Sequence, residues 1–302
     1  MNRPAAMGPW MGAEFTLGAR SHIGKQRVAN EDAYCVLAGP NAPDGSLACF
    51  AVADGMGGHR AGEVASSLAI KELTRLLGAR RFGHSSGGGD PQGGPLLQDV
   101  QAVNREVHRA SRSPDLIGMG TTLTVGLIIR STLHLAHVGD TRAYLLRDGR
   151  LQQLTRDHSW AEEQVEAGLL TPDQAIGHPG RNVLTRALGV AQMVDIDVAE
   201  LSLLQRDILL VCSDGLYSQV MEEDILRILS KEEPQDACER LIDRANQQGG
   251  RDNITAIVLR LDRVSEAVEM GGSATNGESA RDDGRAGGMW SRLVKAMRLS
   301  KS

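Results

Sequence analysis

Short apolar runs separated by brief turns constrain this chain more than any other feature. Several of these runs follow each other with loops too short to hold a crossover helix, so the corresponding strands must pair antiparallel. Seven runs have strand length and are bounded by turn residues. They cover residues 15–17, 47–53, 121–129, 133–138, 143–146, 208–212 and 254–261.

Helical periodicity of apolar residues appears between these runs. Helices are predicted over residues 62–77, 96–110, 160–166, 222–229 and 235–246. Strands in hairpins with amphipathic helices between them predict an α+β fold in which helices cover antiparallel sheets. The glycine-rich segment HSSGGGDPQGG, residues 84–94, is predicted to be a flexible surface insert.

The chain of 302 residues is best interpreted as one domain with a tail, since layered folds commonly run to about 250 residues as one domain. We expect an N-terminal extension over 1–12, a catalytic domain over 13–262 and a disordered linker over 263–288, where periodic apolar residues disappear. Residues 289–302 form a basic amphipathic segment. Two interpretations of this segment stay open: a short helix that binds a membrane surface or a partner, and a frayed tail.

Charge and cysteine usage narrow the class of protein. The net charge of -5 provides no global basic field, which argues against nucleic acid as the main partner and leaves a local anion site open. Cys35, Cys49, Cys212 and Cys238 lack CxxC spacing, and three of them lie in apolar runs, so they are interpreted as core thiols. No signal peptide or run of about 18 apolar residues is present, and we expect a cytoplasmic, reducing location.

Aspartates stand at the ends of four apolar runs. They are Asp54 and Asp214, each followed by glycine, Asp140, and Asp252, which is followed by asparagine. Hard divalent cations need several oxygen ligands on rigid elements, and strand ends supply that rigidity. One Asp-Gly pair after a strand is usually a hairpin turn, but the repetition favours a metal site. Asp140 stays ambiguous, because Gly139-Asp140-Thr141 would also make an ordinary turn.

A second group of polar residues precedes the run 47–53. Arg27 lies four residues before the carboxylate pair Glu31 and Asp32. An arginine fork can hold two phosphate oxygens, and Glu31 can join a metal shell. The alternative is a surface ion pair in a loop.

Together these segments resemble the bacterial branch of the PPM (PP2C-like) metal-dependent protein serine/threonine phosphatases. Eight motifs occur in the family order over about residues 13–262, which makes coincidence implausible. They are RVANED (27–32), DGMGGH (54–59), GTT (120–122), VGDTR (138–142), LTRDHS (154–159), NVLTRALG (182–189), CSDGL (212–216) and GRDNIT (250–255).

The resemblance implies a four-layer sandwich of two central antiparallel β-sheets flanked by α-helices. It also implies two or three Mn²⁺ or Mg²⁺ ions per subunit. By this analogy Asp54 bridges two metals, with Glu31 and the carbonyl of Gly55 on one side and Asp214 and Asp252 on the other.

Further roles follow from the same resemblance. Asp140, together with Asp214, would help to hold a third, weaker metal. Asp32 and Asn253 would act behind the direct ligands, and Asp32 would do so through waters. Arg27 would bind the substrate phosphate, which places it with Asp54 and Asp214 among the catalytic residues. Residues 160–185 would form a mobile flap beside the site.

The implied mechanism is direct attack of a metal-bridging water on phosphorus, without a phospho-enzyme intermediate or a cysteine nucleophile. Animal members carry a histidine, proposed as general acid, where this chain and its bacterial relatives have Met56. A thioether cannot donate a proton. His59 is the nearest histidine in sequence, and it is more often a structural or flap-facing group. The expected flap also contains His158, Ser159 and His178. These residues either affect substrate access or are ordinary polar residues of a loop.

The implied function is hydrolysis of phosphoserine and phosphothreonine in proteins by a monomeric enzyme of signal transduction that reverses a bacterial Ser/Thr protein kinase. Three alternatives were weighed. A two-metal nuclease or phosphodiesterase is disfavoured, because no basic stripe is present. A metal-free regulator is disfavoured by the retention of Glu31, Asp54, Asp214 and Asp252. A partner-switching phosphatase acting on one small regulatory protein is not distinguished by the sequence.

Overall fold

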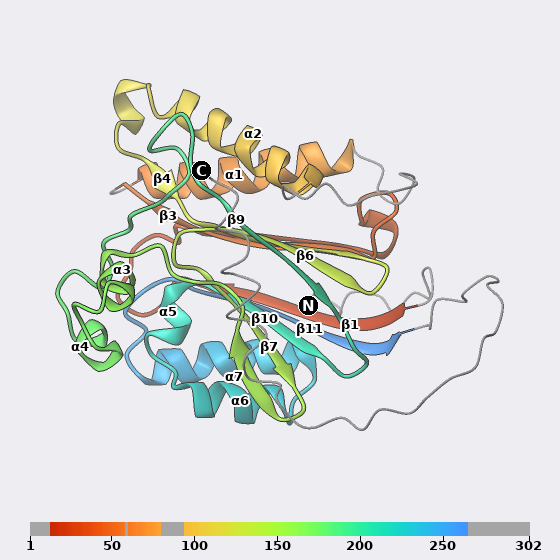
Figure 1. Ribbon diagram of the computed structural model, residues 1–302. Coiled ribbons are helices and arrows are strands. Elements are labelled where there is room, and N and C mark those ends of the chain that lie inside the picture. The colour runs from red at the N-terminus through yellow and green to blue at the C-terminus, as the bar shows by residue number, and fades with distance from the viewer. Residues whose placement is uncertain (1–12, 58–59, 80–93, 265–302) are drawn as a thin grey trace. The chain divides into compact units, whose positions relative to one another are not determined.

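The computed structural model describes residues 13–57, 60–79 and 94–264. Two antiparallel β-sheets form the centre of this part, and helices cover the outer face of each (Figure 1). The first sheet has five strands in the order β1-β11-β10-β7-β8. Their bounds are Ala13–His22 (β1), Ile254–Val264 (β11), Ile208–Cys212 (β10), Arg142–Arg147 (β7) and Arg150–Gln153 (β8).

The second sheet has five strands in the order β2-β3-β5-β6-β9, and a short sixth strand, β4, pairs with the end of β3. Their bounds are Asp32–Ala38 (β2), Ala48–Met56 (β3), Gly120–Thr121 (β4), Leu123–Ile129 (β5), Thr132–Val138 (β6) and Asp197–Ser202 (β9). Strand β3 is buried along Ala48 to Ala53 without alternation, because both faces of the sheet are covered.

Long amphipathic helices form the outer layers. Helices α1 (Arg60–Gly78) and α2 (Gly94–Ala110) cover the second sheet, and α6 (Glu222–Leu229) and α7 (Pro234–Gln247) cover the first (Figure 1). Short helices α3 (Trp160–Glu166), α4 (Pro172–Ile176) and α5 (Asp214–Tyr217) lie in connections, as do 3₁₀ turns at Gly39–Asn41 and Pro114–Leu116.

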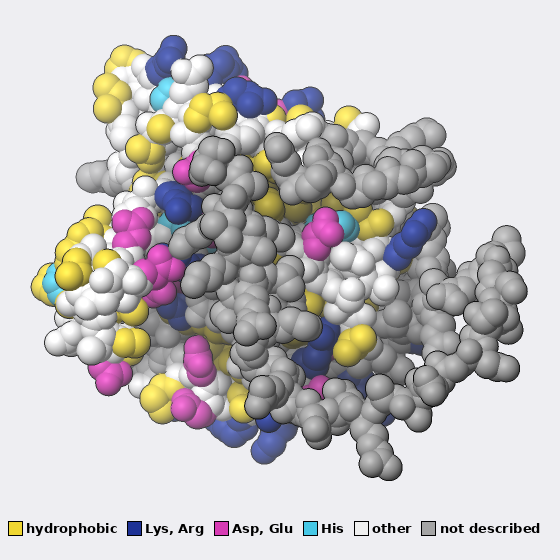
Figure 2. Space-filling model, in the orientation of Figure 1, with side chains coloured by type: hydrophobic (Ala, Val, Ile, Leu, Met, Phe, Trp, Pro, Cys, Tyr) yellow, Lys and Arg dark blue, Asp and Glu magenta, His cyan; other side chains and the backbone are white. Residues whose placement is uncertain are grey.

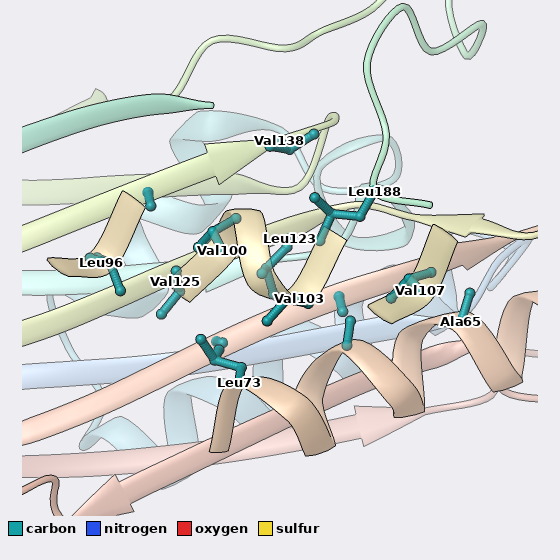
Figure 3. Close-up of a cluster of buried hydrophobic side chains, with 14 of the residues drawn as sticks. Ala65, Leu73, Leu96, Val100, Val103, Val107, Leu123, Val125, Val138 and Leu188 are labelled. Carbon is teal, nitrogen blue, oxygen red and sulfur yellow. The ribbon is translucent and has the colours of Figure 1, made fainter. Parts of the chain in front are cut away.

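Each helical layer closes its own core. On α2 the side chains of Val100, Val103 and Val107 recur at helical spacing, and those of Val100 and Val103 lie near Leu123 and Val125 of β5 (Figure 3). A second cluster of buried apolar side chains joins the first sheet to α5, α6 and α7. These two cores hold the strands in place, so their ends are rigid supports for polar groups.

The predicted α+β class with two antiparallel sheets is confirmed. Helices α3 and α6 and strand β10 have the predicted bounds. The run 121–129 is wrong as one strand, because it divides into β4 and β5 at Thr122, whose hydroxyl binds the backbone of Asp54. Three strands were not predicted, β2, β8 and β9, and α4 and α5 were also missed.

Three of the four cysteines, Cys49, Cys212 and Cys238, are buried and free, and Cys35 is partly buried, which confirms core thiols. Burial raises the pKa of the Cys35 thiol to about 11. The predicted extension, linker and basic segment lie outside the described residues, as does the insert, except that Gly94 begins α2 and β11 continues to Val264. Within the described ranges, no helix is long and apolar enough to cross a membrane.

Candidate metal centre

Five carboxylates line one cavity of about 380 Å³ at the ends of the strands of both sheets. Asp54 lies at the end of β3, Asp140 follows β6, Asp214 follows β10 and begins α5, and Asp252 precedes β11. The cavity is lined by Arg27, Glu31, Asp54, Gly55, Met56, Gly57, Thr122, Asp140, Asn182, Leu184, Asp214 and Asp252. The structure therefore brings together all of the residues predicted as direct ligands, and Arg27 with them.

Hydrogen bonds from the β4–β5 junction fix the backbone of Asp54. Its amide donates to Oγ1 of Thr122 at 2.9 Å. Its carbonyl accepts from Oγ1 of Thr121 at 2.9 Å and from the amide of Thr122 at 2.9 Å. Because these hydrogen bonds fix the backbone of Asp54, its side chain is held at the cavity.

Two glycines allow three segments to meet at the cavity wall. A Cβ added to Gly55 would lie 2.1 Å from the carbonyl oxygen of Gly62 on α1. A Cβ added to Gly62 would lie 2.9 Å from the carbonyl oxygen of Gly55 and 3.0 Å from the Cδ atom of Glu31. The amide of Gly55 also donates to the carbonyl of Glu31 at 3.1 Å. Gly62 therefore belongs to the site, a role that its place in a helical repeat did not indicate.

Asn253 secures the loop that carries Arg27 and Glu31. Its Oδ1 accepts from the amide of Glu31 at 2.7 Å. Its Nδ2 donates to the carbonyls of Ile23 and Ala29, each at 2.9 Å. This asparagine does not line the cavity, and it acts by holding the Glu31 backbone against β11.

Asp32 lies behind the cavity. Its Oδ2 accepts hydrogen bonds from the hydroxyls of Ser213 at 2.7 Å and Thr255 at 2.6 Å, and it pairs opposite Asp54 across β2 and β3. Burial, which the two hydroxyls only partly offset, raises the pKa of Asp32. Its other oxygen is buried without a hydrogen-bond partner, which leaves an acceptor for a water between Asp32 and the cavity.

Arg27 extends over the carboxylates from an exposed loop. Its Nη2 donates to Oδ2 of Asp252 at 2.7 Å, and its Nη1 lies 4.0 Å from Oε2 of Glu31. The side chain is 47% exposed, so the guanidinium is accessible from the mouth of the cavity. A dianionic phosphate entering the cavity would meet this fork first.

The electrostatics of the cavity favour a bound cation. Burial, followed by repulsion from neighbouring carboxylates, raises the pKa of Asp54 and of Asp140 well above the ordinary range for aspartate. Burial and Asp252 likewise raise the pKa of Asp214. Buried carboxylates are normally paired with cations, and a divalent cation would relieve these costs together.

An oxygen without a hydrogen-bond partner also supports a cation in the cavity. Oδ1 of Asp214 is buried and has no hydrogen-bond partner. Within the described residues, no three or more His, Cys, Asp or Glu side chains enclose one ion by themselves. Hard cations such as Mg²⁺ keep several waters and take only some ligands from protein, so an open arrangement of carboxylates and a backbone carbonyl fits them. The residues present therefore fit divalent metals with oxygen ligands.

The turn that carries Asp140 is held from two sides. Gly139 adopts a left-handed φ of 107°, and its amide donates to Nδ1 of His158 at 3.1 Å, while its carbonyl accepts from the amide of His158 at 2.7 Å. On the other side, Oη of Tyr217 donates to the carbonyl of Asp140 at 2.9 Å. Tyr217 ends α5, the helix that begins at Asp214, so one helix supports two of the cavity carboxylates.

The segment predicted as a flap begins beside this turn. Trp160 donates its amide to the carbonyl of Val183 at 2.8 Å, so the segment closes on itself. Leu169 and Ile176 are exposed on it, and Figure 2 shows hydrophobic side chains on the surface of α4. Asn182 and Leu184, near its end, line the cavity.

Two histidines of the expected flap, His158 and His178, do not line the cavity. His178 packs its ring against Trp160, with centroids 4.6 Å apart. His158 supports the Asp140 turn, as described above, and its Nε2 lies 3.2 Å from Oδ2 of Asp197. His59 lies outside the described residues. Thr122, Tyr217 and Gly62 were given no role by the sequence, although Thr122 lies in one of the eight motifs.

Three comparisons place this geometry among known proteins. The sequence model of the family described as Protein phosphatase 2C matches residues 19–258. The serine/threonine phosphatase stp of Listeria monocytogenes serotype 4b (strain F2365) is 39% identical over 261 residues, covering 83% of this chain and 96% of that protein.

Solved structures agree with the sequence comparison. The crystal structure of the Mycobacterium tuberculosis serine/threonine phosphatase PstP/Ppp has a TM-score of 0.71 at 38% identity, covering 82% of this chain and 99% of that chain. The catalytic domain of serine threonine protein phosphatase PstP in complex with two manganese ions has a TM-score of 0.69 at 37% identity, covering 82% and 98%.

Proposed function

The chain belongs to the protein phosphatase 2C family and is a metal-dependent protein serine/threonine phosphatase, and on this premise we propose which residues hold the metals. Two ions, Mn²⁺ or Mg²⁺, are held by the carboxylates and one carbonyl of the cavity. The ligands are Glu31, Asp54, the Gly55 carbonyl, Asp214 and Asp252. The convergence of these groups with Arg27 on one cavity is the observation that carries the proposal.

Asp140 holds a third, weaker ion together with Asp214. Both lie at the cavity, and the backbone turn of Asp140 is tied to α5 through Tyr217. Because Asp140 would serve only the weaker third ion and is not a ligand of the main pair, its loss should leave the main pair of ions in place. Asp32 and Asn253 act behind the ligands by holding β2 and the Glu31 loop.

Each residue of the cavity has a part in the reaction. Metal ions held by these residues would supply Lewis acidity, which would lower the pKa of a coordinated water and offset charge on the phosphoryl oxygens. Arg27 binds two oxygens of the phosphate and orients it in the cavity. Asp54 and Asp214 are the carboxylates on which the metal pair depends. Met56 cannot donate a proton, and no histidine among the described residues lines the cavity, so none of these residues is assigned as the proton donor to the leaving oxygen.

The cysteines take no part in this chemistry. A thiol nucleophile reacts as a thiolate, which needs a depressed pKa. Burial instead raises the pKa of Cys238 to about 12 and that of Cys212 further. None of the four lines the cavity. Activity should therefore survive thiol-blocking reagents.

We propose that the substrates are the targets of a Ser/Thr protein kinase, and that the kinase itself is among them. The enzyme would act as a monomer in the cytoplasm. The alternative, a partner-switching phosphatase dedicated to one small regulatory protein, predicts a single good substrate rather than a set. Dephosphorylation of several phosphothreonine proteins at comparable rates would favour the kinase-opposing role.

Asp140→Ala tests the assignment of the ligands. Calorimetric titration with Mn²⁺ should show the two main sites intact, and phosphate release from a phosphothreonine peptide should fall strongly. Turnover near that of the wild type at saturating metal would reduce Asp140 to a turn residue. Loss of all metal binding would instead place it in the main pair.

A further inference from the structure

Two exposed cations stand next to cavity-lining residues in the chain, Lys25 near Arg27 and Arg251 beside Asp252. Lys25 and Arg251 are exposed, and neither forms an ion pair with any residue that the structure describes. Most other arginines of the described ranges pair with carboxylates, as Arg147 does with Asp207 and Arg244 with Asp224. Some other exposed cations, such as Arg105 and Lys231, also have no ion pair among the described residues, so what distinguishes Lys25 and Arg251 is their place in the chain beside Arg27 and Asp252.

Their place is set by two loops that are joined closely. The amide of Lys25 donates to the carbonyl of Gly250 at 2.7 Å, and the amide of Gln26 donates to the same oxygen at 3.2 Å. A Cβ added to Gly24, which has a φ of 84°, would lie 2.2 Å from the carbonyl oxygen of Asp252. The close approach fixes the backbone of both loops, so the side chains they carry start from rigid positions.

The side chains lie on both sides of the glycine pair Gly249-Gly250. A Cβ added to Gly250 would lie 3.1 Å from Cγ of Lys25, and one added to Gly249 would lie 3.7 Å from Nε of Arg251. Because these glycines have no Cβ, they leave room for the aliphatic parts of the Lys25 and Arg251 side chains. Lys25 and Arg251 are therefore exposed cations on two adjoining loops, and we call this pair of residues the basic rim.

The basic rim adjoins the group that receives the phosphate. Lys25 is two residues before Arg27, and Arg251 directly precedes Asp252, to which Arg27 donates a hydrogen bond. Two residues of extended chain span about 7 Å. A peptide whose phosphoresidue lies at Arg27 thus brings the side chains two or three positions away within reach of the basic rim.

We propose that the basic rim selects phosphoprotein substrates with a second anionic side chain, a carboxylate or a phosphate, two or three residues from the phosphothreonine. This inference rests on the proposed phosphatase function and goes beyond it by naming a substrate class. The positive charge of the basic rim would attract such a side chain where the peptide leaves the site. Exposed ion pairs contribute modestly, so discrimination should be about three- to tenfold.

The test compares phosphothreonine peptides on the full chain with Mn²⁺. The parent peptide has neutral flanks, two others carry Glu at the second and third positions on one side or the other, and a fourth carries a second phosphothreonine. The glutamate and phosphate arms separate the two sources of negative charge. We expect kcat/KM of the wild type to be about three- to tenfold higher for at least one anionic peptide, and the preference to fall as salt is raised.

The variant Lys25→Gln/Arg251→Gln should lose this preference and keep its rate on the neutral peptide and on para-nitrophenyl phosphate. Lys25→Arg/Arg251→Lys should retain it. Arg105→Gln/Lys231→Gln removes the same charge from exposed positions on other elements and should also retain it. Matching unfolding temperatures would exclude a loss of fold.

If the wild type shows no preference for the anionic peptides, or if Lys25→Gln/Arg251→Gln keeps that preference, the proposed role of the basic rim is wrong. The phosphatase function is unaffected by either result. A wild type that hydrolyses the neutral peptide separates these outcomes from failure of the function itself. A wild type that hydrolyses no peptide overturns the function and this inference with it.

Discussion

Acidification should weaken the fold through one buried histidine, His137. Its Nδ1 lies 2.8 Å from Oγ1 of Thr124, its Nε2 lies 2.9 Å from the carbonyl of Arg156, and its ring packs against that of His158. Burial, with a smaller contribution from His158, lowers the pKa of His137 from 6.5 to about 3. The imidazole is therefore neutral in the folded protein, under the turn that leads to Asp140.

The sign and size of the effect follow from proton linkage. Between pH 3 and 6.5 the unfolded chain binds a proton at this histidine and the folded protein does not, so the free energy of unfolding falls as the pH falls. At pH 5.5, one unit below the unfolded pKa, the loss is about 1.4 kcal/mol. It is absent above pH 7.5, where the imidazole is neutral in both states.

The assay is urea unfolding of the wild type and His137→Gln in EDTA at pH 7.5 and 5.5. At pH 7.5 the variant should be less stable, because the hydrogen bonds to Thr124 and Arg156 are disturbed. At pH 5.5 the difference between the two proteins should shrink by about 1.4 kcal/mol, since the variant has no imidazole to protonate on unfolding. His134→Gln, on the same strand with its side chain reaching solvent, is the control and should show a smaller change. A difference that stays constant or grows at pH 5.5 would refute a buried neutral His137.

Three further outcomes are expected. Tyr217→Phe removes the hydrogen bond to the Asp140 carbonyl, so unfolding should become easier by about 0.5–1.5 kcal/mol in a denaturant titration, and Mn²⁺ calorimetry should still show the main pair of sites. Gly62→Ala should weaken Mn²⁺ affinity about tenfold, because its Cβ presses on the Gly55 carbonyl; unchanged affinity in calorimetry would show that the wall yields. Removal of residues 265–302 should leave the rate on para-nitrophenyl phosphate unchanged, since the described residues that line the cavity all precede them, and a lost rate in a soluble truncated protein would contradict this.

Strands buried on both faces were predictable, whereas three of the four strands at the ends of the two sheet orders were missed and the fourth, β1, was predicted only over residues 15–17. Strand β10 lies in the middle of its sheet, and its continuous apolar run identified it with the observed bounds. Strands β2, β8 and β9 lie at sheet edges, and their residues are mostly half-exposed or exposed. An edge strand buries little of its surface, so its sequence carries a weak hydrophobic pattern.

Some residues of the candidate site could be identified from the sequence, and others could not. Asp54, Asp214 and Asp252 were identifiable because each stands where an apolar run starts or ends, which is a local pattern. Gly62 and Tyr217 act through contacts with residues distant in the chain, and a glycine inside a helical repeat or a tyrosine after Asp-Gly-Leu has no spacing that marks such a contact. The placement of Lys25 and Arg251 on adjoining loops likewise required the fold, since the two residues are 226 positions apart (251 − 25) in the chain.

The dependence of catalysis on metal held by Asp54 is tested most directly by measuring Mn²⁺ binding and phosphate release on the same preparation. For the wild type, calorimetry should show ions bound at the main pair, and hydrolysis of a phosphothreonine peptide should appear with Mn²⁺ and vanish in excess EDTA. Asp54→Asn should bind little Mn²⁺ and release no phosphate. It should also be more stable than the wild type without metal, because a repelling buried carboxylate is gone. Full hydrolysis in excess EDTA, or wild-type turnover by Asp54→Asn, would contradict the account.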